Sequence, residues 1–312
     1  MLTAGRGTRL DPLTRLVAKP AVPLAGRTLV ERVLDWLVAQ QVTDVVLNLH
    51  HLPESITSIV GDGSHLNLRV RYSWENPILG SAGGPRHALD LLGSDTFVIV
   101  NGDTLCDVAL APMIAAHRAS GADVTMAVVP NPAPDHYNGI VLDADDRITG
   151  FVPRGHTGES WHFVGVQIAA ASMFDALPDG VPAESVHGIY KSKLGAATGG
   201  VRAYRVNGRF FDVGTPQDYL ETALAIGGHA TIEPRAIIEA GARVTNSVVW
   251  GGATIGEGAV LDRCIVANVD VPPGLKARDT VFIPARMRRD GDDVRIVGGA
   301  ACFEVLDRSI ER

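Results

Sequence analysis

The sequence predicts an α/β fold, a doubly wound sheet covered by helices on both faces, followed by a short parallel β-helix. Apolar segments alternate between helical and strand periodicity from residue 30 to residue 129. After Gly227 and Gly228, apolar residues recur about every six positions, which is typical of stacked β-coils. The 312 residues are 46% hydrophobic and 20% charged, so the chain has the apolar mass for one large domain and a smaller unit.

The alternating part is expected to contain helices and strands joined by crossovers. Residues 30–41 place Val30, Val33, Leu34, Leu37 and Val38 on one helical face, and the apolar run after them has the length of a strand. The expected helices are 30–41, 84–92 and 110–120, and the expected strands are 45–49, 68–72, 97–100 and 124–129. Continuous apolar strands indicate a parallel sheet, which binds ligands at the carboxyl ends of its strands.

The rest of the chain breaks this alternation. Two segments at 139–142 and 148–152 resemble a hairpin within a mixed lobe that spans residues 137–206. The six-residue period then runs through Ile232, Ile238, Val244, Val249, Ile255 and Leu261, with a slip of one residue before Val249. Two further segments, 294–297 and 302–306, predict a terminal hairpin. We therefore expect domains at 1–228 and 229–284 and a C-terminal tail or hairpin at 285–312.

Charge and composition exclude several classes of protein. A net charge of −7 argues against a nucleic-acid partner. No window is long and apolar enough for a membrane helix, and the first ten residues lack the apolar run of a signal peptide, so we expect no membrane partner and a cytoplasmic protein. Cys106, Cys264 and Cys302 are too scattered for a zinc site and are expected to be buried thiols.

Residues 4–20 form the strongest motif, AGRGTRLDPLTRLVAKP. Gly5 and Gly7 let the backbone approach an anionic group with its N–H dipoles pointing inward. Arg9 and Lys19 add positive charge suited to a triphosphate, and lysine occurs only four times in the whole chain. The string therefore predicts a loop that binds phosphates.

This string resembles the signature of the sugar-1-phosphate nucleotidylyltransferases, G-x-G-T-R-L-x-P-L-T-x(4)-K-P. The resemblance covers about residues 1–226, and the tail is similar to that of the mannose-1-phosphate guanylyltransferase branch. It implies a Rossmann-like, doubly wound mixed sheet as the nucleotidyltransferase domain, followed by a short left-handed parallel β-helix. The positions that match the signature are Gly5, Gly7, Thr8, Arg9, Leu10, Pro12, Leu13, Thr14, Lys19 and Pro20.

The resemblance also implies roles for individual residues. Arg9 would bind the β- and γ-phosphates and Lys19 the region of the α-phosphate. Residues 79–84 (LGSAGG), 100–103 (VNGD) and 211–216 (FDVGTP) are similar to three further family elements. The catalytic set would be Arg9, Lys19, Asp103 and Asp212. The nucleotide would be bound by Ala4, Gly5, Gly7, Thr8, Gly80, Ser81 and Gly83, and the sugar phosphate by Gly139, Arg154 and Gly165.

The nucleotidyl transfer that the resemblance implies is expected to require a metal ion. When an oxygen of the sugar phosphate attacks the α-phosphorus, one anion approaches another, and a hard cation with oxygen ligands offsets the repulsion. The resemblance implies that Asp103 and Asp212 are the ligands of this ion, Mg²⁺. A phosphate monoester is already ionised at neutral pH, so no protein nucleophile or general base is expected.

The sequence departs from the family pattern in places. Only three residues precede Ala4, where the family has a full strand, so we expect the true start to lie upstream. Pro153 stands where the family has a glutamate that accepts sugar hydroxyls, and Phe163 replaces an asparagine, which leaves the sugar open. His50 and His51 are interpreted as a loop pair rather than a metal site. His162 and His187 could line the sugar pocket.

Several functions remain open. GTP and a sugar like mannose 1-phosphate are favoured, and a uridylyltransferase acting on a hexose or amino-sugar 1-phosphate is the alternative. A non-catalytic, nucleotide-sugar-binding regulatory paralogue is the second alternative, although it would be expected to lose one of Arg9, Lys19, Asp103 or Asp212. An acyltransferase is disfavoured because the six-residue repeat is short and His229 is the only histidine beside it. A homo-oligomer formed through the β-helix is a further hypothesis.

Overall fold

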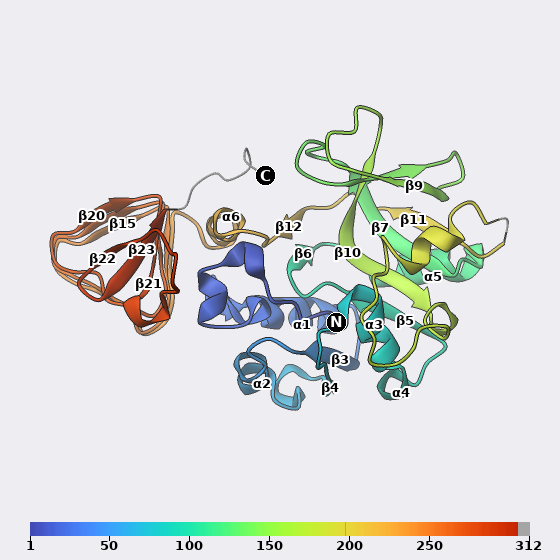
Figure 1. Cartoon of the computed structure of the whole chain (residues 1–312), viewed down its shortest axis with the longest axis horizontal. Coiled ribbons are helices and arrows are strands. Elements are labelled where there is room, and N and C mark those ends of the chain that lie inside the picture. Colours follow the sequence, from blue (N-terminus) through green and yellow to red (C-terminus); the bar gives the residue numbers. More distant parts are fainter. Residues whose placement is uncertain (197, 305–312) are drawn as a thin grey trace. The chain divides into compact units, whose positions relative to one another are not determined.

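The structure, a computed structural model, describes residues 1–196 and 198–304 (Figure 1). The chain divides into two compact units. Unit 1 consists of Met1–Gly5, Val33–Pro53 and Val60–Phe210. Unit 2 consists of Arg6–Arg32, Glu54–Ile59 and the described part of Phe211–Arg312. The segment 6–32 thus belongs with the C-terminal third, and the predicted boundaries at 228 and 284 stay a prediction.

Unit 1 contains a mixed sheet of six strands in the order β11-β7-β10-β8-β9, with β5 also paired to β10. β11 runs parallel to β7, whereas β10 runs antiparallel to β5, β7 and β8. The mixed sheet that the resemblance implied is confirmed. The purely parallel sheet expected from the alternation of helices and strands is not, because the ten-residue strand β10, from the predicted mixed lobe, lies antiparallel between β5 and β7. The strands are β5 (Thr96–Val100), β7 (Val124–Pro130), β8 (Gly139–Leu142), β9 (Ile148–Val152), β10 (Trp161–Ala170) and β11 (Val201–Arg205).

A second, parallel pair of strands in unit 1 is formed by β3 (Asp44–Leu49) and β4 (Arg69–Trp74). The first residues of the chain lie beside both β3 and β5: the Met1 carbonyl accepts a hydrogen bond from the Asn48 N–H, and Leu2 forms a parallel bridge with Asn101. The short strand β6 (Thr104–Cys106) follows β5. The strands predicted at 45–49, 68–72, 97–100 and 124–129 are confirmed within one or two residues at nearly every end.

The helices agree with the sequence in two of three cases. α1 (Leu29–Ala39) and α5 (Leu110–Ser120) lie where they were predicted. The helix predicted at 84–92 is instead two helices, α3 (Gly80–His87) and α4 (Leu89–Leu92), which meet at Ala88 and end at the left-handed Gly93. α2 (Glu54–Val60) was not predicted, since seven residues are too few for a clear helical period. α6 spans Pro216–Gly227.

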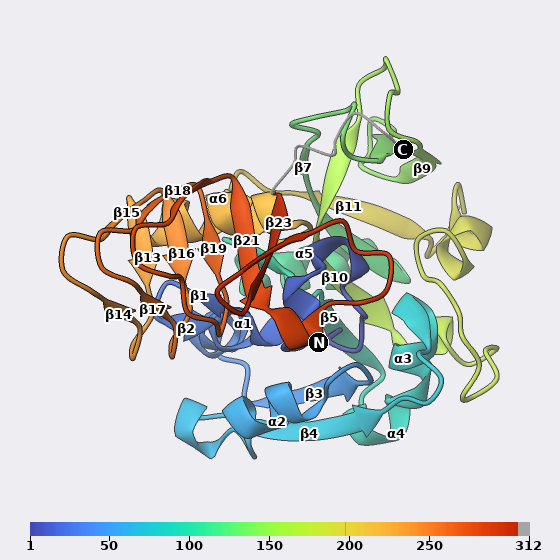
Figure 2. The ribbon, with the colours of Figure 1, turned by 60° about the vertical axis from the view of Figure 1, so that its left-hand side comes forward.

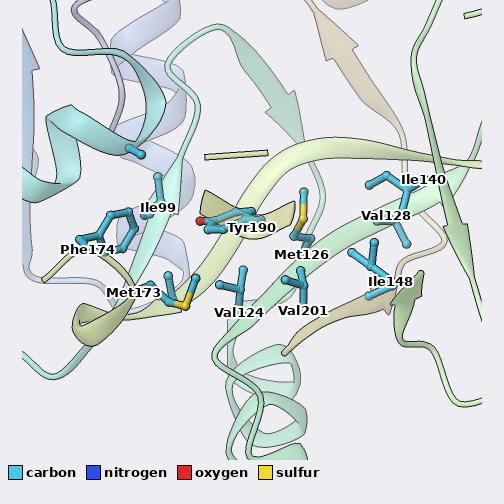
Figure 3. Packing of buried hydrophobic residues seen from close by; sticks show 13 residues of the cluster. Ile99, Val124, Met126, Val128, Ile140, Ile148, Met173, Phe174, Tyr190 and Val201 are labelled. Atoms are coloured by element: carbon cyan, nitrogen blue, oxygen red, sulfur yellow. The ribbon is translucent and has the colours of Figure 1, made fainter. Parts of the chain in front are cut away.

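The core of unit 1 lies where α3 and the sheet meet the segment after β10 (Figure 3). Aliphatic and sulfur side chains from β5, β7, β8, β9 and β11 fill it, together with two large aromatic side chains, those of Phe174 and Tyr190. Both aromatic residues are fully buried. This core holds the ends of β5 and β8 in place, and these ends lead into two of the predicted site segments.

Unit 2 contains three parallel ladders of short strands (Figure 2). Val248 on β16 pairs with Thr231 on β13 and with Ile265 on β19, and a hydrogen bond joins Cys264 to Ser247 across the same step of 17 residues. The strands are β13 (Ala230–Ile232), β14 (Ile237–Ile238), β15 (Arg243–Thr245), β16 (Ser247–Val249), β17 (Thr254–Ile255), β18 (Val260–Asp262), β19 (Ile265–Val266), β20 (Lys276–Arg278) and β21 (Thr280–Pro284). Three strands for each 17 residues account for the six-residue period in the sequence.

The residues of the six-residue pattern differ in how far they are buried. Val249, Ile255 and Leu261, three residues of the six-residue pattern, are fully buried. Ile232 and Ile238, at the start of the pattern, are 46% and 36% exposed, because the first turn of the ladders is stacked on one side only. The terminal hairpin is confirmed as β22 (Arg295–Val297) and β23 (Ala300–Glu304), which are antiparallel; the last two residues of the predicted strand 302–306 lie outside the described residues.

Cys264 and Cys302 are buried free thiols, as predicted, and Cys106 is half-buried. Within residues 1–196 and 198–304, no helix combines the length and the apolar character needed to cross a membrane.

Candidate functional site

The predicted phosphate loop folds in unit 2 as three short 3₁₀ turns, Thr8–Leu10, Leu13–Arg15 and Lys19–Ala21. Gly7 precedes the first turn with φ 60°, a left-handed conformation that favours glycine. A Cβ on Gly7 would lie 2.9 Å from Thr14 Cγ2 and 3.0 Å from Lys19 Cβ, and the Thr14 hydroxyl donates to the Gly7 carbonyl at 3.2 Å. The loop is therefore a tight fold in which only glycine fits at position 7 and Lys19, 7% exposed, lies against it.

Arg9 and the segment after β12 (Phe210–Asp212) lie together in unit 2. A Cβ on Gly214 would lie 3.1 Å from Arg9 Nη1 and 2.9 Å from Asp218 Oδ2, so the guanidinium passes directly over this glycine, two residues after Asp212. Asp218 is itself fixed, since it closes a capping box with Thr215 at the start of α6. Gly214 was not singled out from the sequence, although it belongs to the FDVGTP element.

A buried polar network in unit 1 joins the start of the loop to the glycine-rich helix. The Asn48 side-chain oxygen accepts the N–H groups of Thr3 and Ala4, and its amide donates to Glu75 Oε1 at 2.6 Å. The other oxygen of Glu75 accepts the N–H of Leu79 at 2.7 Å. Sequence reasoning missed this network, because Asn48 is the penultimate residue of β3 and Glu75 follows β4, and only the parallel pairing of those strands brings them together.

Close contacts within unit 1 explain why glycine is needed at two positions of the LGSAGG element. A Cβ on Gly80 would lie 2.8 Å from the Ala183 carbonyl oxygen, and one on Gly83 would lie 2.7 Å from that of Val181. The Ser81 hydroxyl donates to Glu184 Oε2 at 2.7 Å and accepts the N–H of Ser185 at 2.9 Å. The segment 181–185 thus packs against α3, and the predicted nucleotide-binding role of Gly80, Ser81 and Gly83 stays a prediction.

Asp103 follows β5 in a turn of unit 1 that backbone hydrogen bonds fix. The Asn101 N–H donates to the Gly165 carbonyl at 2.8 Å, and the Gly102 N–H donates to the Leu2 carbonyl at 2.9 Å. A Cβ on Gly102 would lie 2.6 Å from that same oxygen, so the turn needs glycine beside Asp103. The half-buried Asp103 side chain is therefore presented by a rigid turn at the carboxyl end of β5.

The two predicted metal ligands are both carboxylates, Asp103 in unit 1 and Asp212 in unit 2. In the described part of the chain, no three or more histidine, cysteine, aspartate or glutamate side chains gather as a metal site. Asp103 and Asp212 offer only carboxylate oxygens, the hard ligands that Mg²⁺ takes singly or in pairs beside phosphate oxygens and water. Their role as metal ligands stays a prediction.

The predicted sugar-phosphate residues lie in unit 1. Gly139 begins β8, and a Cβ there would lie 2.6 Å from Ser160 Cβ. Gly165 has φ 81°, and its Cβ would lie 3.0 Å from Asn101 Cβ, next to the turn of Asp103. Arg154 is exposed just after β9 (Ile148–Val152), and its N–H donates to Asn138 Oδ1 at 3.0 Å.

Two histidines expected near the sugar pocket have aromatic neighbours. The His162 ring lies 4.3 Å from the Tyr137 ring and 5.0 Å from the Phe210 ring, measured between centroids. Burial lowers the pKa of His162 to about 4, so its imidazole is neutral at pH 7. His187 contacts Phe151 edge-on at 6.3 Å. His50 lies within hydrogen-bond distance of the Glu75 carbonyl, 3.0 Å from Nδ1, consistent with a loop residue.

The chain belongs to the nucleotidyl transferase family, whose model matches residues 1–227. This confirms the family predicted from the signature and the prediction of an enzyme.

The chain is also similar to individual named proteins. Mannose-1-phosphate guanylyltransferase of Mycobacterium tuberculosis is 28% identical over 286 residues, covering 85% of this chain and 78% of the relative. UTP–glucose-1-phosphate uridylyltransferase of Synechocystis is 27% identical, covering 99% of this chain and 81% of the relative. Among solved structures, HddC from Yersinia pseudotuberculosis matches with a TM-score of 0.62 at 24% identity, covering 72% of this chain and 96% of that one, which supports the α/β fold.

Proposed function

We propose that the protein transfers a nucleotidyl group from a nucleoside triphosphate to a sugar 1-phosphate and releases pyrophosphate. The main support for this proposal is the conformation of the phosphate loop. Gly7 is required by the fold of the loop, whereas Gly5 is exposed, lacks a left-handed φ, and has no atom of the described chain within 4 Å of a Cβ position. Nothing inside the described protein demands glycine at position 5, but an anion approaching the main chain does.

The reaction needs charge and positioning rather than a protein nucleophile. A phosphate oxygen of the sugar 1-phosphate forms a bond to the α-phosphorus, and the bond from that phosphorus to the bridging oxygen breaks as pyrophosphate leaves. Arg9 and Lys19 stabilise the triphosphate, and Arg154 binds the sugar phosphate. Asp103 and Asp212 would hold Mg²⁺, which would supply positive charge to offset that of the phosphates.

GTP and a sugar like mannose 1-phosphate are our favoured substrates. Relatives named as mannose-1-phosphate guanylyltransferases, among them those of Mycobacterium tuberculosis and Schizosaccharomyces pombe, support this choice. The uridylyltransferase of Synechocystis, which aligns with 99% of this chain, keeps UTP with a hexose or amino-sugar 1-phosphate as the second candidate.

The test is magnesium-dependent pyrophosphate release with GTP, UTP, dTTP, CTP and ATP against a panel of sugar 1-phosphates. We expect one pair of substrates to give the dominant rate. Asp103→Asn should abolish turnover with an unchanged melting temperature, whereas Asp90→Asn, a change at an exposed aspartate of α4, should leave turnover intact. Full activity of Asp103→Asn would refute its metal role, and nucleotide binding without turnover on any pair would favour the regulatory paralogue.

We also propose that the parallel ladders of unit 2 form a short left-handed β-helix through which two copies of the chain associate. The support is the first turn of the ladders, where Ile232 and Ile237 are 46% and 57% exposed beside strand edges that have no further turn stacked on them. Sedimentation at micromolar concentration tests this proposal: Ile237→Lys should shift a dimer to monomer, and a monomeric wild type would remove it.

A further inference from the structure

Arg15 lies in the phosphate loop and is one of the most thoroughly bound charged groups of unit 2. Its side chain is 5% exposed. Nε donates to Asp11 Oδ1 at 2.8 Å, Nη1 donates to the Met287 carbonyl at 3.2 Å and to Asp292 Oδ2, and Nη2 donates to Asp11 Oδ2 and to Asp292 Oδ1 at 3.0 Å. All five N–H donors of the guanidinium are used, and its carbon lies 5.1 Å from the centre of the Phe303 ring.

This arrangement joins two distant parts of the sequence. Asp11 and Arg15 lie between Arg9 and Lys19, whereas Met287 and Asp292 lie 272 and 277 residues further along. A guanidinium that is buried and bidentate to two carboxylates is a strong and directional link, unlike an exposed ion pair. The C-terminal segment 287–303 is therefore attached to the phosphate loop.

The loop needs such an attachment. Its three 3₁₀ turns are three residues long each, so no regular helix fixes their conformation. The residue next to Arg15 is Thr14, whose side chain packs against Gly7 and donates to its carbonyl. Gly7 in turn lies against the stem of Lys19. A displacement of Arg15 would thus reach the glycine turn through Thr14, and the lysine through Gly7.

We propose that Arg15 is a positioning residue through which the C-terminal segment 287–303 holds the phosphate loop in the conformation that receives the triphosphate. The inference rests on the proposed function, because it assumes that this loop binds a nucleotide. It assigns the terminal hairpin a part in nucleotide binding, although the hairpin lies outside the residues matched by the family model.

The experiment measures binding of GTP and UTP by calorimetry and steady-state kinetics on the full chain. Arg15→Lys keeps the charge but loses the bidentate geometry, and Asp292→Asn keeps the shape but loses the charge. We expect each to raise the Kd and KM for the nucleotide about tenfold, while the KM for sugar 1-phosphate changes less than about twofold. Arg278→Lys, at an arginine 70% exposed beside Asp262, is the matched control and should behave as wild type.

Amide hydrogen exchange distinguishes a positioning role of Arg15 from an effect of Arg15 on stability alone. Because coupling between two sites is reciprocal, nucleotide binding should slow amide hydrogen exchange in segment 287–303 of the wild type, and Arg15→Lys should lose this protection. Equal nucleotide affinity in Arg15→Lys, or a loss of melting temperature with unchanged Kd and no protection at 287–303, would overturn the inference. A wild type that binds no nucleotide would instead refute the proposed function.

Discussion

Gly214→Ala offers the sharpest test of the site in unit 2. The new methyl group would lie 3.1 Å from Arg9 Nη1, 3.4 Å from Arg9 Cζ and 2.9 Å from Asp218 Oδ2. Ordinary contacts of this kind are about 3.5–4.0 Å, so one neighbour must move by several tenths of an ångström. The Asp218 carboxylate is held by the N–H and hydroxyl of Thr215, both at 2.8 Å, whereas Arg9 is exposed, so the guanidinium is the group that moves.

The expected result is a kinetic defect in a folded protein. If Arg9 binds the triphosphate, a shift of several tenths of an ångström should lower kcat/KM for the nucleotide about tenfold, because misplacement by 1 Å costs roughly a hundredfold. The melting temperature should fall by only a few degrees, since the alanine adopts the backbone conformation without a left-handed φ and strains at most one helix cap. The assay is pyrophosphate release at varied nucleotide, alongside thermal denaturation.

The matched control is Gly208→Ala, where the new Cβ would lie 3.5 Å from Asp107 Cβ, an ordinary contact. This variant should keep wild-type kinetics. Wild-type kcat/KM in Gly214→Ala would show that the position of Arg9 does not matter for the reaction, and the assignment of Arg9 to the phosphates would then be wrong.

Three further changes have defined outcomes. Arg154→Ala should raise the KM for sugar 1-phosphate severalfold more than the KM for nucleotide, and equal effects in the steady-state assay would contradict its role. Tyr219→Phe should lower the free energy of unfolding by about 2 kcal/mol in urea titrations, because the buried Trp250 Nε1 loses its acceptor at 2.8 Å and the Pro23 carbonyl loses its donor; a loss below about 0.5 kcal/mol would contradict this. The bond to Arg15 lowers the pKa of Asp292 from 3.8 to about 2, so its ionised form stabilises the fold above about pH 4, and this stabilisation should be lost as the pH falls from about 4 towards 2. Asp292→Asn should lose less stability over that range, and parallel pH profiles would refute the assignment.

Local sequence patterns predicted the bounds of helices and strands well where the residues that determine those bounds lie within or next to the element itself. The helix Leu110–Ser120 agrees with its predicted bounds, because a left-handed glycine, Gly121, ends it. The hairpin β8–β9 also agrees residue by residue. Periodicity placed Ile232 and Ile238 on strands but gave no indication of their exposure, since the period does not show whether a neighbouring turn covers a side chain.

The candidate site was likewise predictable only where its residues lie close together in the sequence. The phosphate loop was predictable because its glycines, threonine and cations are contiguous, and the structure shows why Gly7 and Lys19 belong together. The reason for the glycines at 80 and 83 was not predictable, because the atoms that exclude a side chain there belong to segment 181–184. Asp292 was equally hidden, since it lies 277 residues from Arg15.

The step of 16 or 17 residues between stacked strands in unit 2 limits how this part of the gene can change in length. An insertion or deletion of one whole turn would keep every inward-pointing residue inward and every ladder in register. A difference of one residue is accommodated between strands, because both step lengths occur in the ladders. A one-residue shift within a strand would turn its side chains to the opposite face and expose residues such as Val249 and Leu261, which are fully buried. Homologous chains are therefore expected to differ in this segment mainly by complete turns.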